Sequence, residues 1–457
     1  MASDASPATV SPNNRRIVND AVCLRCGCAC DDIDLTIGDQ STGGQIIAAE
    51  RACALGEAWF LAPRDRAAPP AMIEGRPATL AEAIERAAQI LVDARSPLVY
   101  GLNHTTCEAQ RVAVAIADLL GANLDTPTSH EHGPTGMAFQ GVGEMTCTLG
   151  ELRNRCDMLI FWGADPVVSH PRHLSRYSLD PGGMFVPHGR ADRTCVVVDV
   201  RRSATAERAD VFLQVKHARD FEALWTLRAL AQGLPLDAAL VESETGVPIE
   251  RWQDLIERMK RAHFGTLLYG NGLTNAPGRY LNAEAALALT RDMNIYTRFT
   301  CGSMREPGNL PGADNVVLWS TGYPFAVNFA RGYPRYSPGE YAADELLSRS
   351  EVDAALVVAS DPLASDPLER GAAVYLSPAA RARLASIPMI CVGASDNATE
   401  RAATVAIRTA RYGTETGGTI YRMDDVPLAV HAVVDSPYPS DREVLARIEQ
   451  RVRQLRA

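Results

Sequence analysis

Four cysteines near the amino terminus are the residues of this sequence best suited to chemistry. Cys23, Cys26 and Cys30 are separated by two and three residues, and Cys53 follows after 22 more. Three thiolates on one tight loop and a fourth from a later turn can surround one metal centre. The spacing therefore predicts a 4Fe–4S cluster, with a zinc site or thiols without metal as alternatives. Cys28, inside the loop, is expected to be a spectator.

A second polar segment could also do chemistry. Residues 129–134 read Ser-His-Glu-His-Gly-Pro, which places Glu131 beside His132. A carboxylate next to an imidazole can move protons where both line a cleft. The alternative is an ordinary polar loop, because such pairs are often structural.

Basic side chains follow two of the predicted strands. They form two groups: His170, Arg172, His173 and Arg176, and then Arg201 and Arg202. The first group suits an anionic ligand, with a helix start carrying ordinary ion pairs as the alternative. The second stands where dinucleotide-binding folds meet a ribose or a phosphate.

The composition is that of a globular protein and restricts its partners. The 457 residues are 46% hydrophobic and 22% charged, with a formal net charge of −10. An acidic chain argues against nucleic acid or an anionic membrane as partner. No apolar run approaches the ~20 residues of a membrane helix. Residues 1–18 are expected to be a disordered tail. They lack the apolar stretch of an export signal, and this favours a cytoplasmic protein with reduced thiols.

Strands alternating with helices indicate an α/β protein with parallel sheets. Short apolar strands are predicted at residues 32–37, 97–102, 158–163, 194–199, 265–270, 354–359 and 389–393. Capping boxes predict that helices begin at Thr79, Thr105 and Ser440, each with a glutamate three residues later. The last of these helices is expected to dock on its own domain. The predicted division is a cysteine-bearing module at 19–75, Rossmann-like lobes at 76–235 and 236–435, and a terminal helix at 436–457.

Several strings of this sequence resemble one family. They span residues 23–32, 105–110, 132–134, 147–151, 162–166, 170–176, 199–205 and 418–424. In order and spacing, they are similar to the B subunit of formylmethanofuran dehydrogenase, of the molybdopterin oxidoreductase superfamily. The likeness covers roughly residues 18–430.

The resemblance implies a fold and a reaction. The four cysteines would hold a 4Fe–4S cluster, and two Rossmann-like lobes would hold a bis-pterin tungsten or molybdenum cofactor ligated by a cysteine or selenocysteine. The family reduces carbon dioxide reversibly to formate, which a separate amidohydrolase-like subunit fixes on methanofuran. The basic groups at 170–176 and 201–202 would then face a pterin pyrophosphate or the carboxylates of a carrier tail.

The sequence departs from the family at the metal ligand. The family loop reads small-Val-Cys-His-Gly-Pro, and Glu131 stands here in the place of the cysteine. Exchanging a soft thiolate for a hard oxygen alters the affinity for tungsten or molybdenum. The cofactor is therefore expected to be absent. The superfamily's β-rich fourth domain also has no room after the last βα unit.

The departure favours one branch of the family. Aerobic methylotrophs have a related formyltransferase/hydrolase complex, whose B subunit resembles a dehydrogenase subunit without the metal-binding cysteine. The chain is expected to be such a non-redox subunit in one-carbon metabolism, with amidohydrolase-like, formyltransferase and β-helix-like partner subunits and a methanofuran-type coenzyme. The alternative is an active dehydrogenase with Glu131 as a metal ligand, which retention of the four cysteines would support.

Overall fold

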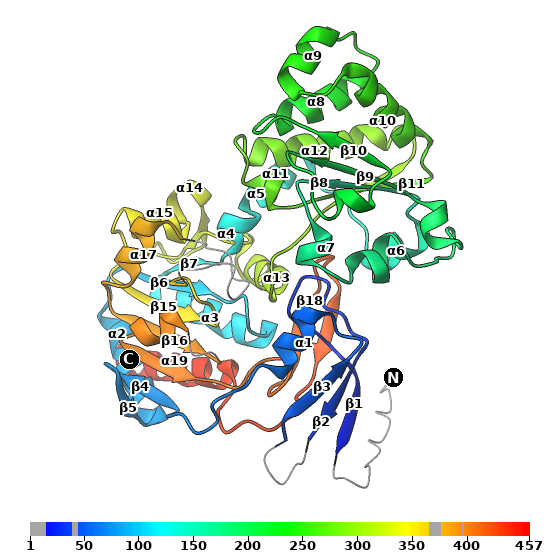
Figure 1. Cartoon of the computed structure of the whole chain (residues 1–457). Helices are drawn as coiled ribbons and strands as arrows, with labels where there is room; N and C mark the ends of the chain where they lie inside the picture. Colours follow the sequence, from blue (N-terminus) through cyan, green and yellow to red (C-terminus); the bar gives the residue numbers. More distant parts are fainter. Residues whose placement is uncertain (1–14, 39–43, 365–375, 395–396) are drawn as a thin grey trace. The chain divides into compact units, whose positions relative to one another are not determined.

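The computed structural model describes residues 15–38, 44–364, 376–394 and 397–457, and it divides into two compact units. Unit 1 consists of Met1–Ser129, Glu306–Arg422 and Pro427–Ala457. Unit 2 consists of His130–Arg305 and Met423–Val426 (Figure 1). The short helix α4 (Thr128–Glu131) runs from one unit into the other.

This division differs from the predicted consecutive lobes. The sheet of unit 2 joins strands from both sides of the predicted boundary at residue 235, because β11 (Phe264–Tyr269) pairs with β8 (Met158–Trp162). In unit 1, β6 (Pro97–Gly101) pairs with β15 (Ala354–Val358) from far along the chain. Unit 2 is therefore an insertion between two halves of unit 1.

Unit 1 is built on a nine-stranded sheet in the order β14-β13-β7-β6-β15-β16-β17-β4-β5. Its remaining strands are β4 (Ala71–Ile73), β5 (Arg76–Ala78), β7 (Asn123–Asp125), β13 (Val327–Asn328), β14 (Arg335–Tyr336), β16 (Met389–Gly393) and β17 (Val405–Arg408). The five central strands are parallel, and the outer pairs at each side are antiparallel. The chain winds outward in both directions from β6 and β15, so their junction is the topological switch point.

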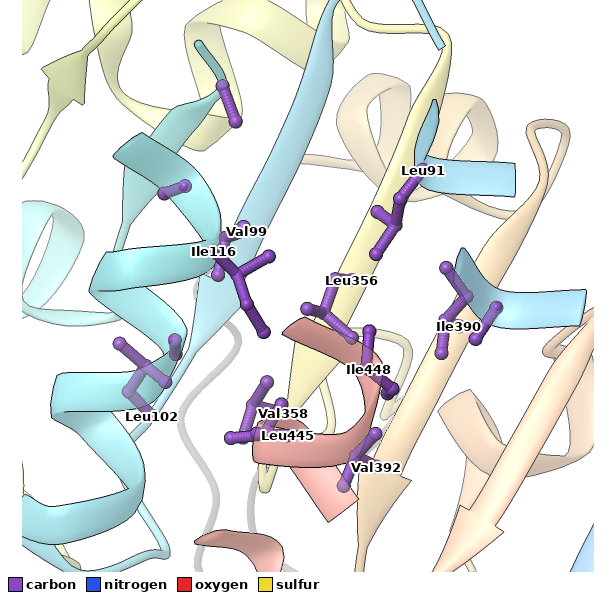
Figure 2. Packing of buried hydrophobic residues seen from close by; sticks show 14 of the residues in the cluster. Leu91, Val99, Leu102, Ile116, Leu356, Val358, Ile390, Val392, Leu445 and Ile448 are labelled. Carbon is purple, nitrogen blue, oxygen red and sulfur yellow. The ribbon is translucent and has the colours of Figure 1, made fainter. Parts of the chain in front are cut away.

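Helices cover this sheet and complete its core. They are α2 (Leu80–Asp93), α3 (Cys107–Leu120), α13 (Leu310–Thr321), α14 (Pro338–Tyr341), α15 (Ala343–Ser348), α17 (Pro378–Leu384), α18 (Ala398–Ala402) and α19 (Asp441–Arg456). Figure 2 shows Ile116 of α3 and Ile448 of α19 packed over Val99, Leu356 and Ile390 of the strands. The terminal helix thus docks on its own unit, as predicted.

A small cysteine-bearing subdomain completes unit 1. Strands β1 (Arg16–Ala21), β2 (Ile33–Ile37) and β3 (Ile46–Glu50) form an antiparallel sheet, followed by α1 (Ala54–Leu61). The hairpin of β18 (Gly418–Tyr421) and β19 (Pro427–Val430) packs beside it through Ile420 and Val430. The predicted tail at 1–18 is wrong for residues 16–18, which pair with β2. Residues 1–14 lie outside the described part.

Unit 2 holds a five-stranded parallel sheet in the order β10-β9-β8-β11-β12. Its other strands are β9 (Thr194–Asp199), β10 (Val211–Gln214) and β12 (Arg298–Ser303). Its helices and turns are α5 (Gly133–Val142), α6 (Leu149–Arg155), α7 (Pro166–Ser169), η2 (Leu174–Ser178), η3 (Gly189–Asp192), η4 (Ala206–Arg208), α8 (Asp220–Ala231), α9 (Ala238–Thr245), α10 (Ile249–Arg261), α11 (Asn271–Thr274) and α12 (Tyr280–Met293). The stacked Trp162 and Trp252 lie in its core.

Two of the three predicted capping boxes are confirmed. Thr79 and Ser440 each accept the backbone N–H three residues on. At α3, however, the N-cap is Thr106 and makes no side-chain cap. Tertiary contacts occupy both side chains of the predicted capping box instead. Thr105 Oγ1 donates to Asp441, and Glu108 accepts from Thr419. None of the described helices is both long and apolar enough to cross a bilayer.

Candidate functional site

The cysteine loop is a tight turn that leads out of β1 and into β2. The Cys23 N–H donates to the Cys30 carbonyl at 2.8 Å, and the Ala29 N–H donates to the Cys26 carbonyl at 3.1 Å. Ala29 adopts a φ of +38°, which lets the chain reverse within the loop. Cys53 is the N-cap of α1. Two separate elements therefore supply the four thiols, as the spacing predicts.

The four thiols lie close enough to influence one another. Burial raises the pKa of Cys23, and Cys26, Cys30 and Cys53 raise it further by repulsion between thiolates. A methyl group placed on Gly56 would lie 2.9 Å from the sulfur of Cys23 and 3.8 Å from that of Cys53. The thiols thus gather around one point.

Cys28 lies beside these thiols, and its predicted role as a spectator stays a prediction. A thiol hydrogen bond with Cys26, followed by burial, raises its pKa. All eleven cysteines are free thiols. Within the described residues, no three His, Cys, Asp or Glu side chains are arranged as a closed metal-binding group. The thiols are therefore gathered in number and kind for a cluster or zinc, without being closed around a centre.

Glu131 is buried in unit 2 and faces a cation. Its side chain is 0% exposed, and its Oε2 lies 3.7 Å from the guanidinium of Arg305, which is 13% exposed. The His132 ring is 3.9 Å away on the other oxygen. Burial, reinforced by the charge of Arg305, lowers the pKa of His132 to about 3. His132 is therefore neutral, and Arg305 is the cation beside Glu131.

Hydrogen bonds occupy both ring nitrogens of His132. Nε2 lies 3.4 Å from the Met304 carbonyl, and Nδ1 lies 3.3 Å from Thr135 Oγ1. Because a carbonyl only accepts, Nε2 carries the hydrogen, and Nδ1 accepts from the hydroxyl. Tyr269 in turn donates to Thr135 at 3.1 Å. Both ring nitrogens of His132 are thus engaged in hydrogen bonds. A proton-handling role for Glu131 and His132 stays a prediction.

His170 and His173 are also buried and neutral. His170 Nε2 donates to the Arg305 carbonyl at 3.0 Å, and His173 Nδ1 lies 3.0 Å from the hydroxyl of Ser178. Burial lowers their pKa values to about 4 and about 3, respectively. The expected cationic cluster therefore reduces to Arg172 and Arg176. His132 and His170 instead fix the consecutive carbonyls of Met304 and Arg305, which positions the Arg305 side chain.

The neutral histidines make the stability of unit 2 depend on pH. The pKa values of His170 and His173 are lowered relative to about 6.5 in the unfolded chain, so unfolding takes up protons below that pH. The stabilisation is complete above pH 6.5 and is lost as the pH falls towards 4. We expect a loss of about 2 kcal/mol per histidine between pH 7 and pH 5. Urea unfolding at the two pH values measures this change in the free energy of unfolding. Hydrogen exchange of the β8 and η2 peptides shows that it arises in unit 2.

A matched pair of variants checks this prediction. His173→Gln should flatten the pH dependence, whereas His188→Gln should not, because the side chain of His188 is exposed beside Asp192. An unchanged slope in His173→Gln would contradict the assignment.

The second basic group lies at the carboxyl end of β9. Arg201 and Arg202 are exposed. Arg202 forms a 2.6 Å ion pair with Glu207 and lies over the ring of Phe212. The Arg201 backbone N–H donates to Asp199. The position is the one expected from the sequence, while binding of a nucleotide there stays a prediction.

The comparisons with known proteins place this geometry in one family. The chain is 39% identical over 449 residues to the B subunit of the tungsten-containing formylmethanofuran dehydrogenase 2 of Methanocaldococcus jannaschii, covering 96% of this chain and 99% of that one. The counterpart in Methanococcus maripaludis is 35% identical, with 96% and 100% covered. This chain belongs to the family of formylmethanofuran dehydrogenase B subunits.

Further similarities extend beyond the dehydrogenases. The B subunit of the formyltransferase/hydrolase complex of Methylorubrum extorquens is 28% identical over 310 residues, a weaker match that covers 64% of this chain and 75% of that one. A crystal structure of that complex with methylofuran superposes with a TM-score of 0.68 at 25% identity, covering 84% of this chain and 99% of that one. No family model matches.

The fold is confirmed more widely. Acetylene hydratase from Pelobacter acetylenicus has a TM-score of 0.68 at 13% identity, with 95% of this chain and 69% of that one covered. The chain thus has the molybdopterin oxidoreductase fold predicted from its strings.

Three buried polar atoms mark the switch point of unit 1 as a place for a polar ligand in this dehydrogenase-family chain. They are Asn103 Oδ1, Thr126 Oγ1 and Ser360 Oγ, and each lacks a hydrogen-bond partner among the described residues. They follow the adjacent parallel strands β6, β7 and β15. Unpaired buried polar groups are costly, so a ligand there would satisfy them. A polar ligand such as a pterin nucleotide could form hydrogen bonds with these three groups. Sequence reasoning missed them, although each stands within two residues of a strand end.

The predicted metal-ligand position, Glu131, suits a tungsten or molybdenum centre less well. The resemblance implies a cysteine where this chain has Glu131. The Glu131 carboxylate forms an ion pair with the Arg305 guanidinium at 3.7 Å. A second cation beside Arg305 would meet like-charge repulsion in a buried setting. A hard carboxylate paired with a guanidinium is a poorer ligand for tungsten or molybdenum than a thiolate.

Proposed function

We propose that this chain is a B subunit of a formyltransferase/hydrolase complex in one-carbon metabolism and carries no redox centre at Glu131. One observation carries the proposal: a buried carboxylate paired with Arg305 replaces the family's metal-ligating thiolate. A thiolate is a soft ligand for tungsten or molybdenum, and a carboxylate is a hard one. The ion pair supplies internally the charge balance that a metal would otherwise give.

In this role the subunit would scaffold its partners and hold the coenzyme. Support comes from the solved formyltransferase/hydrolase complex, which contains methylofuran. We propose amidohydrolase-like, formyltransferase and β-helix-like partner subunits, and a methanofuran-type coenzyme whose anionic groups meet Arg172 and Arg176. These guanidiniums suit carboxylates through paired hydrogen bonds.

The second candidate function is an active dehydrogenase. Its support is the 39% identity to a tungsten-containing enzyme and the gathered thiols of Cys23, Cys26, Cys30 and Cys53. These thiols would hold a 4Fe–4S cluster, which would supply one-electron transfer. The chain's own contribution would be to gather and orient the thiols.

Elemental analysis separates the two functions. The complex is purified without oxygen, and iron, tungsten, molybdenum and zinc are measured per chain alongside the visible spectrum. We expect neither tungsten nor molybdenum, because Arg305 opposes a cation at Glu131. One tungsten or molybdenum per chain would overturn the proposal and restore the dehydrogenase. Roughly four irons per chain would show that the cysteines hold a cluster in either case.

A further inference from the structure

Unit 2 contains a cavity at the opposite end of its sheet from Arg305 and His170. Its volume is about 620 Å³, and its lining includes Phe264 and Arg298, where β11 and β12 begin. The loops that carry the candidate site follow the other ends of these strands. A strand of six residues spans roughly 20 Å, so the cavity is separate from that site.

The carboxylates in this cavity are already satisfied. The two oxygens of Asp157 accept the backbone N–H groups of His263 and Phe264, each at 2.9 Å. Asp192 accepts the backbone N–H of His188 at 2.7 Å and lies 3.1 Å from its Nδ1. Both acidic groups therefore bind the backbone around the cavity, and within the described residues neither forms an ion pair with Arg155 or Arg298.

Two arginines of the cavity, Arg155 and Arg298, have no carboxylate partner within the described residues. Some exposed arginines elsewhere in unit 2 are paired, as Arg190 is with Asp210 and Arg202 with Glu207. Two guanidiniums without an ion pair on one cavity can donate charge-assisted hydrogen bonds to an anion.

An exposed aromatic ring stands next to one of these arginines. Phe185 is 59% exposed, and the guanidinium carbon of Arg155 lies 4.8 Å from its ring centre. The turn that presents the ring is fixed, because the Phe185 N–H donates to the Asn154 carbonyl at 2.9 Å. Gly183 permits this close packing, since a methyl group there would lie 2.2 Å from the Arg153 carbonyl. The backbone that carries the ring is thus fixed, and the ring itself is exposed beside Arg155.

We infer that this cavity binds an organic anion with a flat aromatic body. The charged group would lie between Arg155 and Arg298, and the flat body would lie against Phe185. The volume falls within the range of small-molecule sites and exceeds what an inorganic ion fills. Guanidiniums donate paired hydrogen bonds to carboxylates and phosphates alike, so the shared chemistry is an anionic group with two acceptor oxygens.

Fluorescence titration of the purified full chain with 1-naphthyl phosphate tests the inference. We expect saturable binding that Arg155→Gln and Arg298→Gln each weaken about tenfold, since a charge-assisted hydrogen bond contributes about 1.5–3 kcal/mol. Phe185→Ala should weaken 1-naphthyl phosphate while leaving inorganic phosphate unchanged. Arg258→Gln, at an exposed arginine already paired with Asp254, is the matched control. All four side chains are exposed, so the variants should fold.

Two comparisons decide whether the cavity binds an aromatic anion. Comparing 1-naphthoate with 1-naphthyl phosphate distinguishes a carboxylate from a phosphate ligand, and tighter binding of either supports the site. Binding that is absent at millimolar concentration, or equal in the wild type and the Arg155→Gln/Arg298→Gln double variant, would overturn it. Neither result bears on the metal content at Glu131.

Discussion

Glu131→Ala should destabilise unit 2 by about 3–5 kcal/mol. The substitution removes a fully buried carboxylate and leaves the Arg305 guanidinium, itself 13% exposed, without the negative charge 3.7 Å away. Breaking a buried ion pair on one side costs more than the pair contributes, because the remaining charge keeps its desolvation penalty. Urea unfolding of the purified chain gives the free energy of unfolding. Hydrogen exchange of the α5 and β12 peptides then shows whether unit 2 carries the loss.

A double-mutant cycle separates the ion pair from simple loss of volume. Arg305→Met should also destabilise, and the double variant Glu131→Ala/Arg305→Met should recover part of the loss, because no uncompensated charge remains. Glu131→Gln keeps the volume and should lie between wild type and Glu131→Ala. Strictly additive losses in the double variant would show that the two groups do not act as a pair.

Arg193→Met should destabilise unit 2 by on the order of 4 kcal/mol. The buried Arg193 guanidinium donates to four backbone carbonyls, those of Arg153, Cys156, Leu179 and Pro181. Methionine fills similar space but leaves these buried acceptors unsatisfied, and each costs about 1–3 kcal/mol. The segment between β8 and β9 would lose its attachment to α6.

The matched control is Arg202→Met. Arg202 is exposed and forms a surface ion pair with Glu207, so its loss should cost less than about 1 kcal/mol. Thermal unfolding and hydrogen exchange of residues 179–193 measure both variants. If the two arginines cost the same, the carbonyl contacts of Arg193 do not stabilise this segment.

The central strands could be predicted because they carry their signal locally. The apolar runs at 194–199 and 389–393 coincide with β9 and β16, which are buried on both faces. Strands such as β12 and β17 were missed, since Arg298–Ser303 and Val405–Arg408 mix polar and apolar residues. Their strand state comes from pairing with β11 and β16.

The candidate site was only partly predictable for the same reason. The spacing of Cys23, Cys26 and Cys30 is local, so the sequence indicates a thiol group directly. Arg305, by contrast, stands far from Glu131 in the sequence, and only the fold brings its charge to the carboxylate. Burial also decides the charge of His173, and burial is set by packing rather than by residue type.

The insertion of unit 2 into unit 1 has a consequence during synthesis on the ribosome. Strand β6 ends at Gly101, whereas its neighbour β15 begins at Ala354, and α19 covers the core only after Asp441. Nearly all of unit 2 emerges as one continuous stretch and can fold while the chain is still growing. At about 5–20 residues per second, β6, α2 and α3 must wait tens of seconds with apolar faces uncovered. This interval is when the nascent chain most needs a chaperone.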